Sequence, residues 1–139
     1  SVGVMLAGSI LNPVTAGGSL LIFILLGAFG LPVFAGGTGG IQVILGPTGG
    51  YLFGYLLAAF IMAKILQGTK RNIKKLLAVN LLGAIIIYSC GVPQLSFITG
   101  MNFKQAIAAG VLPYILGDLV KIMIAILLAK RLEKIIDVN

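Results

Sequence analysis

Long apolar runs, separated by short polar or glycine-rich stretches, make up most of this sequence. No Asp, Glu, Lys or Arg occurs between Ser1 and Ala63. A helix that spans a lipid bilayer needs about 20 consecutive, mostly apolar residues. The pattern therefore predicts a bundle of membrane-spanning helices, and the 139 residues of the chain have room for about five spans joined by short loops.

The breaks in the apolar pattern predict where helices and loops lie. Asn12-Pro13 ends a first run and Gly30-Leu31-Pro32 ends a second. Pro47 suits the first turn of a third helix, where its missing N–H costs nothing. The predicted helices cover residues 2–11, about 13 to 30, 46–65, 76–91 and 106–128, with Pro113 breaking the last one locally. The predicted loops cover residues 64–75 and 93–104, and residues 130–139 form an amphipathic or frayed tail.

Residues 35–50 are dense in glycine and show no helical periodicity, so we predict a structured loop there. Irregular backbone at membrane depth occurs only where protein buries it or where it lines a cavity. The loop is therefore a candidate part of a binding site, although a flexible connector would have a similar composition. Its apolar side chains, such as Val43 and Leu45, favour the ordered alternative because they need burial.

Composition supports one integral-membrane domain over residues 1–139. The chain is 59% hydrophobic and only 9% charged, whereas about 25% of residues are charged in an average soluble domain. Mean hydropathy is +1.14. Gly46, Gly50 and Gly54 recur at four-residue spacing, which favours close approach of a neighbouring helix. We find neither a linker nor an internal repeat, so the predicted fold class is an all-α, polytopic membrane bundle.

The positive charges lie mainly in two groups, residues 64–75 and 130–134, and the net charge is +7. Both groups directly follow apolar segments, as cytoplasmic anchors do under the positive-inside rule. We therefore predict that these groups face the cytoplasm and that residues 31–47 and 92–105 face outward, with Lys104 as a lone basic exception. The same rule accounts for the positive charge without a nucleic-acid partner.

The residues that would support catalysis or metal binding are scarce. The chain has no His and a single cysteine, Cys90, which excludes a Ser-His-Asp triad, an internal disulfide and a typical zinc site. No GxxxxGK[ST] loop is present, so we do not expect this chain to hydrolyse ATP. We expect neither an enzyme nor a cofactor.

Asp118 and Lys121 are the only two charged residues in the middle of a predicted span. A charge at the centre of a spanning helix costs roughly 2.5–3.5 kcal/mol on insertion scales, so such residues usually face the bundle interior. Their i, i+3 spacing places both on one helix face, and we expect Asp118 roughly 18 Å along the helix from Ala106. A polar ligand site is the preferred interpretation, and a structural ion pair is the alternative.

Three further residues are weaker candidates for a site. The amides near Thr48 begin a helix and could bind a carboxylate, although an ordinary helix start has the same sequence. Tyr51 suits either an interfacial position or a ligand contact. Gln42 lies between Ile41 and Val43, which suits a buried hydrogen bond as well as a side chain that reaches water.

Three ordered sequence blocks resemble the signature of the BioY family. The blocks are Gly30-Leu31-Pro32-Val33-Phe34-Ala35-Gly36-Gly37, Gly46-Pro47-Thr48-Gly49-Gly50-Tyr51-Leu52, and Leu112-Pro113-Tyr114 with Gly117-Asp118-Leu119-Val120-Lys121. BioY proteins are the biotin-binding S components of energy-coupling-factor (ECF) transporters. The resemblance implies a six-helix bundle that captures biotin near the outer face.

The resemblance also implies partners and site residues. The partners are a transmembrane coupling protein and two ATP-binding subunits. Asp118 and Lys121 occupy the positions whose acidic and basic side chains contact biotin in the family. The substrate-binding residues that we expect are Asp118, Lys121, Gln42, Thr48, Tyr51 and Gly37. Alternatives are an S component for another vitamin, or a structural membrane subunit that binds no ligand.

Two departures from the family pattern concern the first part of the chain. The family has a helix before the one that ends at Asn12, and in S components that helix docks on the coupling protein. We expect the natural polypeptide to begin earlier, because Ser1 is not an initiator Met. The family often has a basic residue in the turn at 12–16, where this chain has Val14.

Overall fold

The computed structural model describes residues 2–133. The elements in chain order are α1 (Val2–Ile10), α2 (Pro13–Ala28), η1 (Ala35–Gly37), α3 (Ile41–Ile44), α4 (Gly49–Leu66), α5 (Ile73–Thr99), α6 (Phe103–Gly110), η2 (Leu112–Tyr114) and α7 (Ile115–Leu132). The prediction of an all-α membrane bundle is confirmed.

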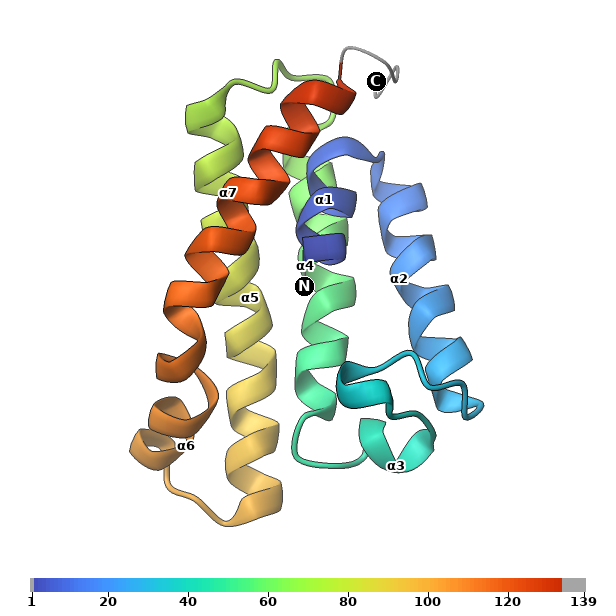
Figure 1. The fold of residues 1–139 in the computed structure, drawn as a ribbon, viewed down its shortest axis with the longest axis vertical. Coiled ribbons are helices and arrows are strands. Elements are labelled where there is room, and N and C mark those ends of the chain that lie inside the picture. The colour runs from blue at the N-terminus through green and yellow to red at the C-terminus, as the bar shows by residue number, and fades with distance from the viewer. Residues whose placement is uncertain (1, 134–139) are drawn as a thin grey trace.

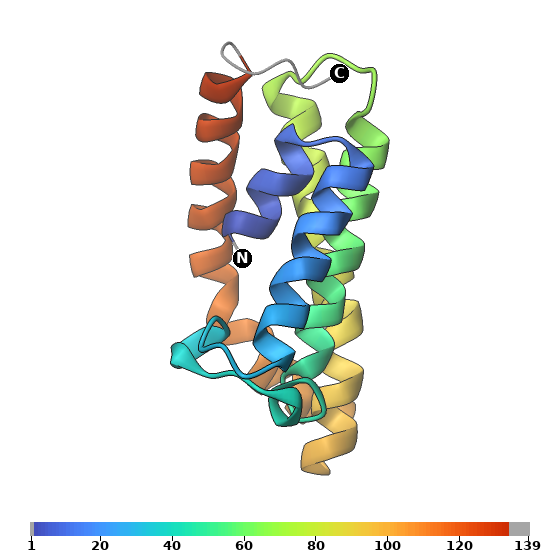
Figure 2. The ribbon, with the colours of Figure 1, turned by 90° about the vertical axis from the view of Figure 1, so that its right-hand side faces the viewer.

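The long helices run side by side, with α4 and α5 antiparallel at the centre (Figure 1). Helix α2 packs on α4, α7 packs on α5, and the short α1 packs between α4 and α7 (Figures 1 and 2). The turn at 11–12, the loop at 67–72 and the last turns of α7 share one end of the bundle, at the top of Figure 1. We call this the basic end, because it holds the basic group 64–75 and residues 130–131 of the second group. Residue 134 of that group and residues 135–139 of the predicted tail lie outside the described residues. The segment 29–48 and α6 occupy the opposite end, the loop end.

Asparagine side chains start three of the helices. Asn12, Asn72 and Asn102 each accept a hydrogen bond from the backbone N–H three residues later, at 2.8 Å. These bonds satisfy an amide that has no partner within the helix. At α6 the cap is reciprocal, because the Gln105 side chain accepts from the Asn102 N–H. The polar residues between the apolar runs thus set the helix boundaries.

Three helices within residues 2–133 are long and apolar enough to cross a membrane, which is fewer than the five for which the length had room. They are α4, α5 and the combined segment Phe103–Leu132. Helix α2 is shorter, with 16 residues, and α1 has 9 residues. The loop between α4 and α5 is also shorter than predicted, because α4 continues to Leu66 and α5 begins at Ile73.

The predicted loop at 93–104 is wrong over its first half. Helix α5 continues through Pro93 to Thr99 and ends at Gly100, whose φ of 77° is left-handed. Proline removes one backbone donor, but spanning helices tolerate it when the surroundings satisfy the freed carbonyl. The extra turns carry Gln94 and Leu95 to the loop end of the bundle.

The local break predicted at Pro113 is confirmed, and it separates the span predicted at 106–128 into two helices. Helix α6 ends at Gly110, and α7 begins at Ile115 after the short turn η2. Pro113 lacks an N–H and disfavours the helical conformation of the residue before it. Asp118 therefore lies in the first turn of α7 rather than roughly 18 Å along one helix from Ala106. Pro47 also differs from its predicted place, since it precedes the first residue of α4, Gly49.

Glycine and alanine allow the helices to approach closely in the core. A Cβ added to Gly54 would lie 2.8 Å from the Ile87 Cα, so α4 and α5 touch backbone to backbone there. The side chain of Met62 is fully buried, and a Cβ on Gly8 would lie 2.9 Å from its Cβ. Gly50 also meets the α5 backbone, at Cys90 and Gly91. The four-residue glycine spacing thus marks a helix interface at Gly50 and Gly54.

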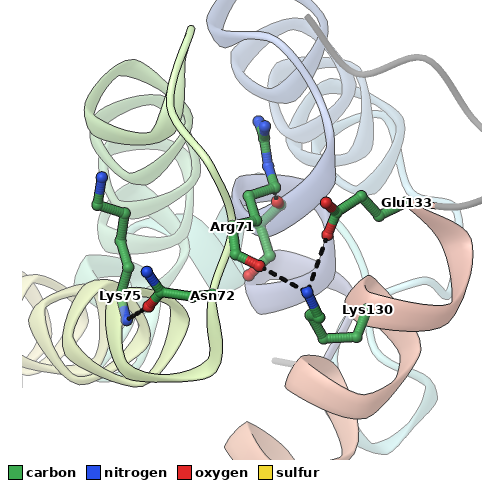
Figure 3. A network of polar contacts seen from close by, with 6 residues as sticks. Arg71, Asn72, Lys75, Lys130 and Glu133 are labelled. Carbon is green, nitrogen blue, oxygen red and sulfur yellow. Dashed lines mark hydrogen bonds and ion pairs between the residues drawn. The ribbon is translucent and has the colours of Figure 1, made fainter.

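A polar network closes the basic end (Figure 3). The Arg71 Nε donates to the Ser9 carbonyl oxygen at 2.8 Å, and Asn80 donates to the Ser9 hydroxyl at 3.0 Å. Lys130 donates to the Arg71 carbonyl oxygen at 3.0 Å and lies 3.6 Å from the Glu133 carboxylate. Burial lowers the pKa of the Arg71 guanidinium, and the Glu133 charge opposes that shift. The network joins α1, α5, the 67–72 loop and the end of α7.

Candidate functional site

A cavity of about 610 Å³ lies between the helices towards the loop end. This volume falls within the range of small-molecule sites, about 300–1,000 Å³. Every long helix and the segment 29–48 contribute to the wall. The lining residues are Met5, Phe23, Val33, Phe34, Ala35, Thr38, Val43, Thr48, Tyr51, Leu52, Tyr55, Ala84, Ile87, Tyr88, Leu95, Ala109, Gly110, Tyr114, Asp118 and Lys121.

Asp118 is the acidic group of this cavity. The Tyr88 hydroxyl on α5 donates a hydrogen bond to its Oδ2 atom. Its Oδ1 atom lies 4.0 Å from the Lys121 ammonium, a long and loose ion pair. The Asp118 side chain is 14% exposed, whereas that of Lys121 is 43% exposed. One carboxylate oxygen is thus held by the protein, while the other oxygen and the ammonium keep capacity for a ligand.

All four tyrosines of the chain line the cavity. The Tyr51 hydroxyl donates to the Gly110 carbonyl oxygen at 2.9 Å. The rings of Tyr51 and Tyr88 meet edge to face, with centroids 6.3 Å apart. Tyrosine combines a large apolar ring with a hydroxyl that needs a partner when buried. The tyrosines, with Thr38, Thr48, Asp118 and Lys121, are the polar members of a mainly apolar lining.

The structure brings together four of the six predicted site residues. Asp118, Lys121, Thr48 and Tyr51 line the cavity, although they come from two helices that are far apart in the sequence, α4 with its N-cap and α7. Tyr55 and Tyr88 were not among the predicted site residues, and Tyr114 was noted only as part of a sequence block. The available signal was a tyrosine within an apolar run, because its hydroxyl is costly to bury without a hydrogen bond.

Gln42 and Gly37 lie outside the cavity lining, which corrects their predicted placement. The Gln42 side chain is exposed and donates to the Gly39 carbonyl oxygen at 2.9 Å. Its neighbour Val43 faces the cavity instead. Gly37 lies in an exposed turn with a left-handed φ of 73°, so its contribution is to the shape of the loop.

At the start of α4, where we predicted a carboxylate site, some backbone N–H groups already donate hydrogen bonds within the protein. The Gly49 N–H donates to the Gly46 carbonyl oxygen and the Tyr51 N–H donates to the Thr48 carbonyl oxygen, each at 3.2 Å. Gly49 and Gly50 are buried. Thr48 remains at the cavity wall, and its hydroxyl makes no helix-capping hydrogen bond.

The segment 29–48 is an ordered cover and not a flexible connector. Phe34 is only 4% exposed, and its ring packs edge to face on Phe23 with centroids 5.6 Å apart. The Gly40 N–H donates to the Gly27 carbonyl oxygen, which ties the loop to the end of α2. The expectation of a structured loop is confirmed, and the loop contributes Ala35, Thr38 and Val43 to the cavity.

The cavity suits a small ligand with both polar and apolar parts. Asp118 accepts hydrogen bonds from N–H groups, and Lys121 donates to a carbonyl or carboxylate oxygen. Apolar walls from Phe23, Phe34 and Ile87 fit rings or methylene chains. Within residues 2–133, no group of three or more His, Cys, Asp or Glu residues could hold a metal ion.

The sequence model of the BioY family matches residues 1–138 of this chain. A protein named biotin transporter BioY from Thermotoga maritima is 41% identical over 113 residues, covering 81% of this chain and 66% of the relative. A protein named probable biotin transporter BioY from Pyrococcus horikoshii is 43% identical over 130 residues, covering 94% of this chain and 75% of the relative. The chain thus spans between 66% and 75% of these two relatives.

The fold also matches a solved structure. The S-component for biotin from an ECF-type ABC transporter superposes with a TM-score of 0.88 and 33% sequence identity. The match covers 96% of this chain and 72% of the solved one. The helix order described above therefore occurs in a fold for which a crystal structure is known.

Proposed function

This chain belongs to the BioY family, and we propose that it is a membrane subunit that captures biotin for uptake by an ECF-type ABC transporter. The observation that carries the proposal is the cavity in which Asp118 and Lys121 face one space among apolar and tyrosine side chains. The similar solved structure is an S-component for biotin, which supports the same ligand. The family is a transporter family, so we do not propose an enzyme.

The chemistry of biotin matches the cavity group by group. Biotin has a urea ring with two N–H donors and a carbonyl acceptor, a thioether ring, an apolar chain and a carboxylate. Asp118 accepts from the urea N–H groups in our proposal. Lys121 donates to the urea oxygen or to the ligand carboxylate. The aromatic and aliphatic walls enclose the thioether ring and the chain.

The partners in this proposal are a transmembrane coupling protein and two cytosolic ATP-binding subunits. The similar solved protein is a component of an ECF-type ABC transporter, which supports the presence of such partners. The sequence has no GxxxxGK[ST] loop, so ATP hydrolysis is assigned to the separate subunits. We expect neither a cofactor nor nucleic acid to be needed.

The orientation in this proposal follows the charge distribution. The basic end faces the cytoplasm and the loop end, with the cavity, faces outward. The positive-inside rule supports this arrangement, because the groups 64–75 and 130–131 lie together at one end of the bundle. Biotin then enters the cavity from outside the cell.

A panel of vitamins separates this function from its alternatives. The purified protein in lipid nanodiscs is titrated with biotin, thiamine, riboflavin and folate by calorimetry and by thermal unfolding. We expect heat of binding and a higher unfolding temperature with biotin alone. Binding of another vitamin in place of biotin would indicate a different S component. A folded protein that binds none of them would indicate a structural subunit.

A further inference from the structure

We propose that Gln94 is a positioning residue for the binding cavity, which holds the connection between α3 and α4 in place as one of its walls. Gln94 does not line the cavity. The Gln94 Nε2 atom donates to the Ile44 carbonyl oxygen at 2.9 Å and to the Gly46 carbonyl oxygen at 2.7 Å. This inference rests on the proposed function for the identity of the ligand.

Both carbonyls have room for a donor from outside the segment. Helix α3 has only four residues, Ile41–Ile44, so the Ile44 carbonyl has no partner within the helix. The Gly46 carbonyl accepts from the Gly49 N–H at 3.2 Å and has a second lone pair for Gln94. An unsatisfied carbonyl is costly in or near a bilayer because no water replaces the missing donor. Gln94 supplies one N–H to each carbonyl and is only partly exposed.

The backbone around Gln94 is built for close approach. A Cβ added to Gly49 would lie 2.6 Å from the Gln94 Nε2 atom, and a Cβ on Gly50 would lie 3.0 Å from the Gln94 Cβ atom. Both glycines are buried. A larger side chain at either position would push α5 away and break the two hydrogen bonds.

The segment that Gln94 holds, residues 44–46, lies between two residues of the cavity wall. Val43 precedes this segment and Thr48 follows it, and both line the cavity. Leu95, the neighbour of Gln94, lines the cavity as well. Gln94 therefore sets the position of a cavity wall without lining the cavity itself. Loss of its two hydrogen bonds should raise the dissociation rate of the ligand more than it lowers the association rate.

Two variants and a control test this role. Gln94→Leu removes the donor, whereas Gln94→Glu keeps the size and replaces the amide with a carboxylate that repels both carbonyls. Gln67→Leu makes the same exchange at an exposed position after α4, at the basic end. The release of radiolabelled biotin from nanodiscs, its association rate, and amide hydrogen exchange over residues 41–49 without ligand are measured for each protein.

We expect Gln94→Leu to release biotin about tenfold faster, with the association rate within about threefold of the parent. Exchange should rise over 41–49 in this variant and remain unchanged in Gln67→Leu. Release from Gln94→Glu, relative to the parent at each pH, should slow as the pH falls, because protonation returns one O–H donor. This pH response also decides the question if Gln94→Leu does not fold.

Release of biotin from Gln94→Leu at the parent rate would overturn the proposal, even with faster amide exchange. The two hydrogen bonds of Gln94 would then be structural only. Unchanged exchange over 41–49 would overturn it as well. A parent protein that does not bind biotin would refute the proposed function instead, and exchange over 41–49 would then decide alone whether Gln94 holds this wall.

Discussion

Three interactions stabilise the charged side chain of Asp118 at the cavity. It lies in the first turn of α7, where the positive end of the helix dipole stabilises a carboxylate. Tyr88 holds one oxygen, and Lys121 lies near the other. The arrangement keeps a charged group within an apolar bundle and still leaves an acceptor directed at the cavity.

The first prediction concerns this acceptor. Asp118→Asn keeps the size of the side chain but replaces a carboxylate by an amide that also donates. Loss of a charge-assisted hydrogen bond costs roughly 1.5–3 kcal/mol, so biotin affinity should fall about ten- to hundredfold at about 1.4 kcal/mol per tenfold change. Titration calorimetry measures the change.

Changes at Lys121, alone and combined with Asp118→Asn, distinguish a ligand site from a purely structural ion pair. Lys121→Met alone should weaken binding and stability, because Asp118 is left without its cation. If the pair only locked the bundle, the double variant Asp118→Asn with Lys121→Met would regain stability and bind biotin as the parent does. Lys104→Met makes the same exchange at an exposed site at the start of α6 and should leave binding unchanged.

The second prediction concerns Tyr88, which acts on the ligand through Asp118. Tyr88→Phe removes only the hydroxyl and should weaken biotin binding about three- to tenfold, because one hydrogen bond contributes about 1 kcal/mol. In an Asp118→Asn background the same change should have less than half of this effect, since the two residues act as a unit. Equal losses in both backgrounds would contradict this coupling.

Among the elements, the contact between α4 and α5 depends on the absence of side chains. The third prediction is that Gly54→Ala destabilises the protein by about 1–3 kcal/mol, because the added methyl meets the Ile87 backbone. Gly18→Ala in α2 is the control, since nothing lies within 4 Å of its added Cβ. That change should be neutral or stabilising by up to about 1 kcal/mol. Unfolding in mild detergent measures the stability of both variants. A Gly54→Ala protein as stable as Gly18→Ala would argue against close contact between α4 and α5.

The sequence predicted most helices but treated two prolines incompletely. Local sequence indicates a break at Pro113, but it does not show that α5 continues through Pro93 or how far the break at 111–114 separates two helices. The break frees the Gly110 carbonyl oxygen, and Tyr51 supplies its donor from a position 59 residues away. A partner so distant in sequence is not visible in a local pattern.

The sequence identified the cavity residues whose charged side chains cost the most free energy to bury in a membrane. Asp118 and Lys121 stood out because charges are rare within spans, and their place at the cavity follows from the same reasoning. Gln42 was misplaced because α3 has a single turn, and four residues do not indicate which face lies inward. Tyr55 and Tyr88 were missed because tyrosine also occurs at membrane surfaces and in cores.

For the whole molecule, the gathering of positive charge at one end gives the fourth prediction, which concerns topology. In intact cells and a Cys90→Ser background, an impermeant thiol reagent should label Lys104→Cys from outside and leave Lys70→Cys unlabelled. Both positions are exposed, so access from one side alone decides the result. Labelling of both after permeabilisation is the control. Outside labelling of Lys70→Cys in intact cells would contradict the proposed orientation.

The fifth prediction follows from the place of the tyrosines. The sequence contains no tryptophan and four tyrosines, and all four line the cavity. The near-ultraviolet emission of this protein therefore comes from the cavity wall, so the chain carries its own optical reporter of occupancy. Saturating biotin should change that emission without any label, and Asp118→Asn should shift the titration to higher biotin concentrations. An unchanged spectrum at saturation would mean that the ligand binds away from these rings.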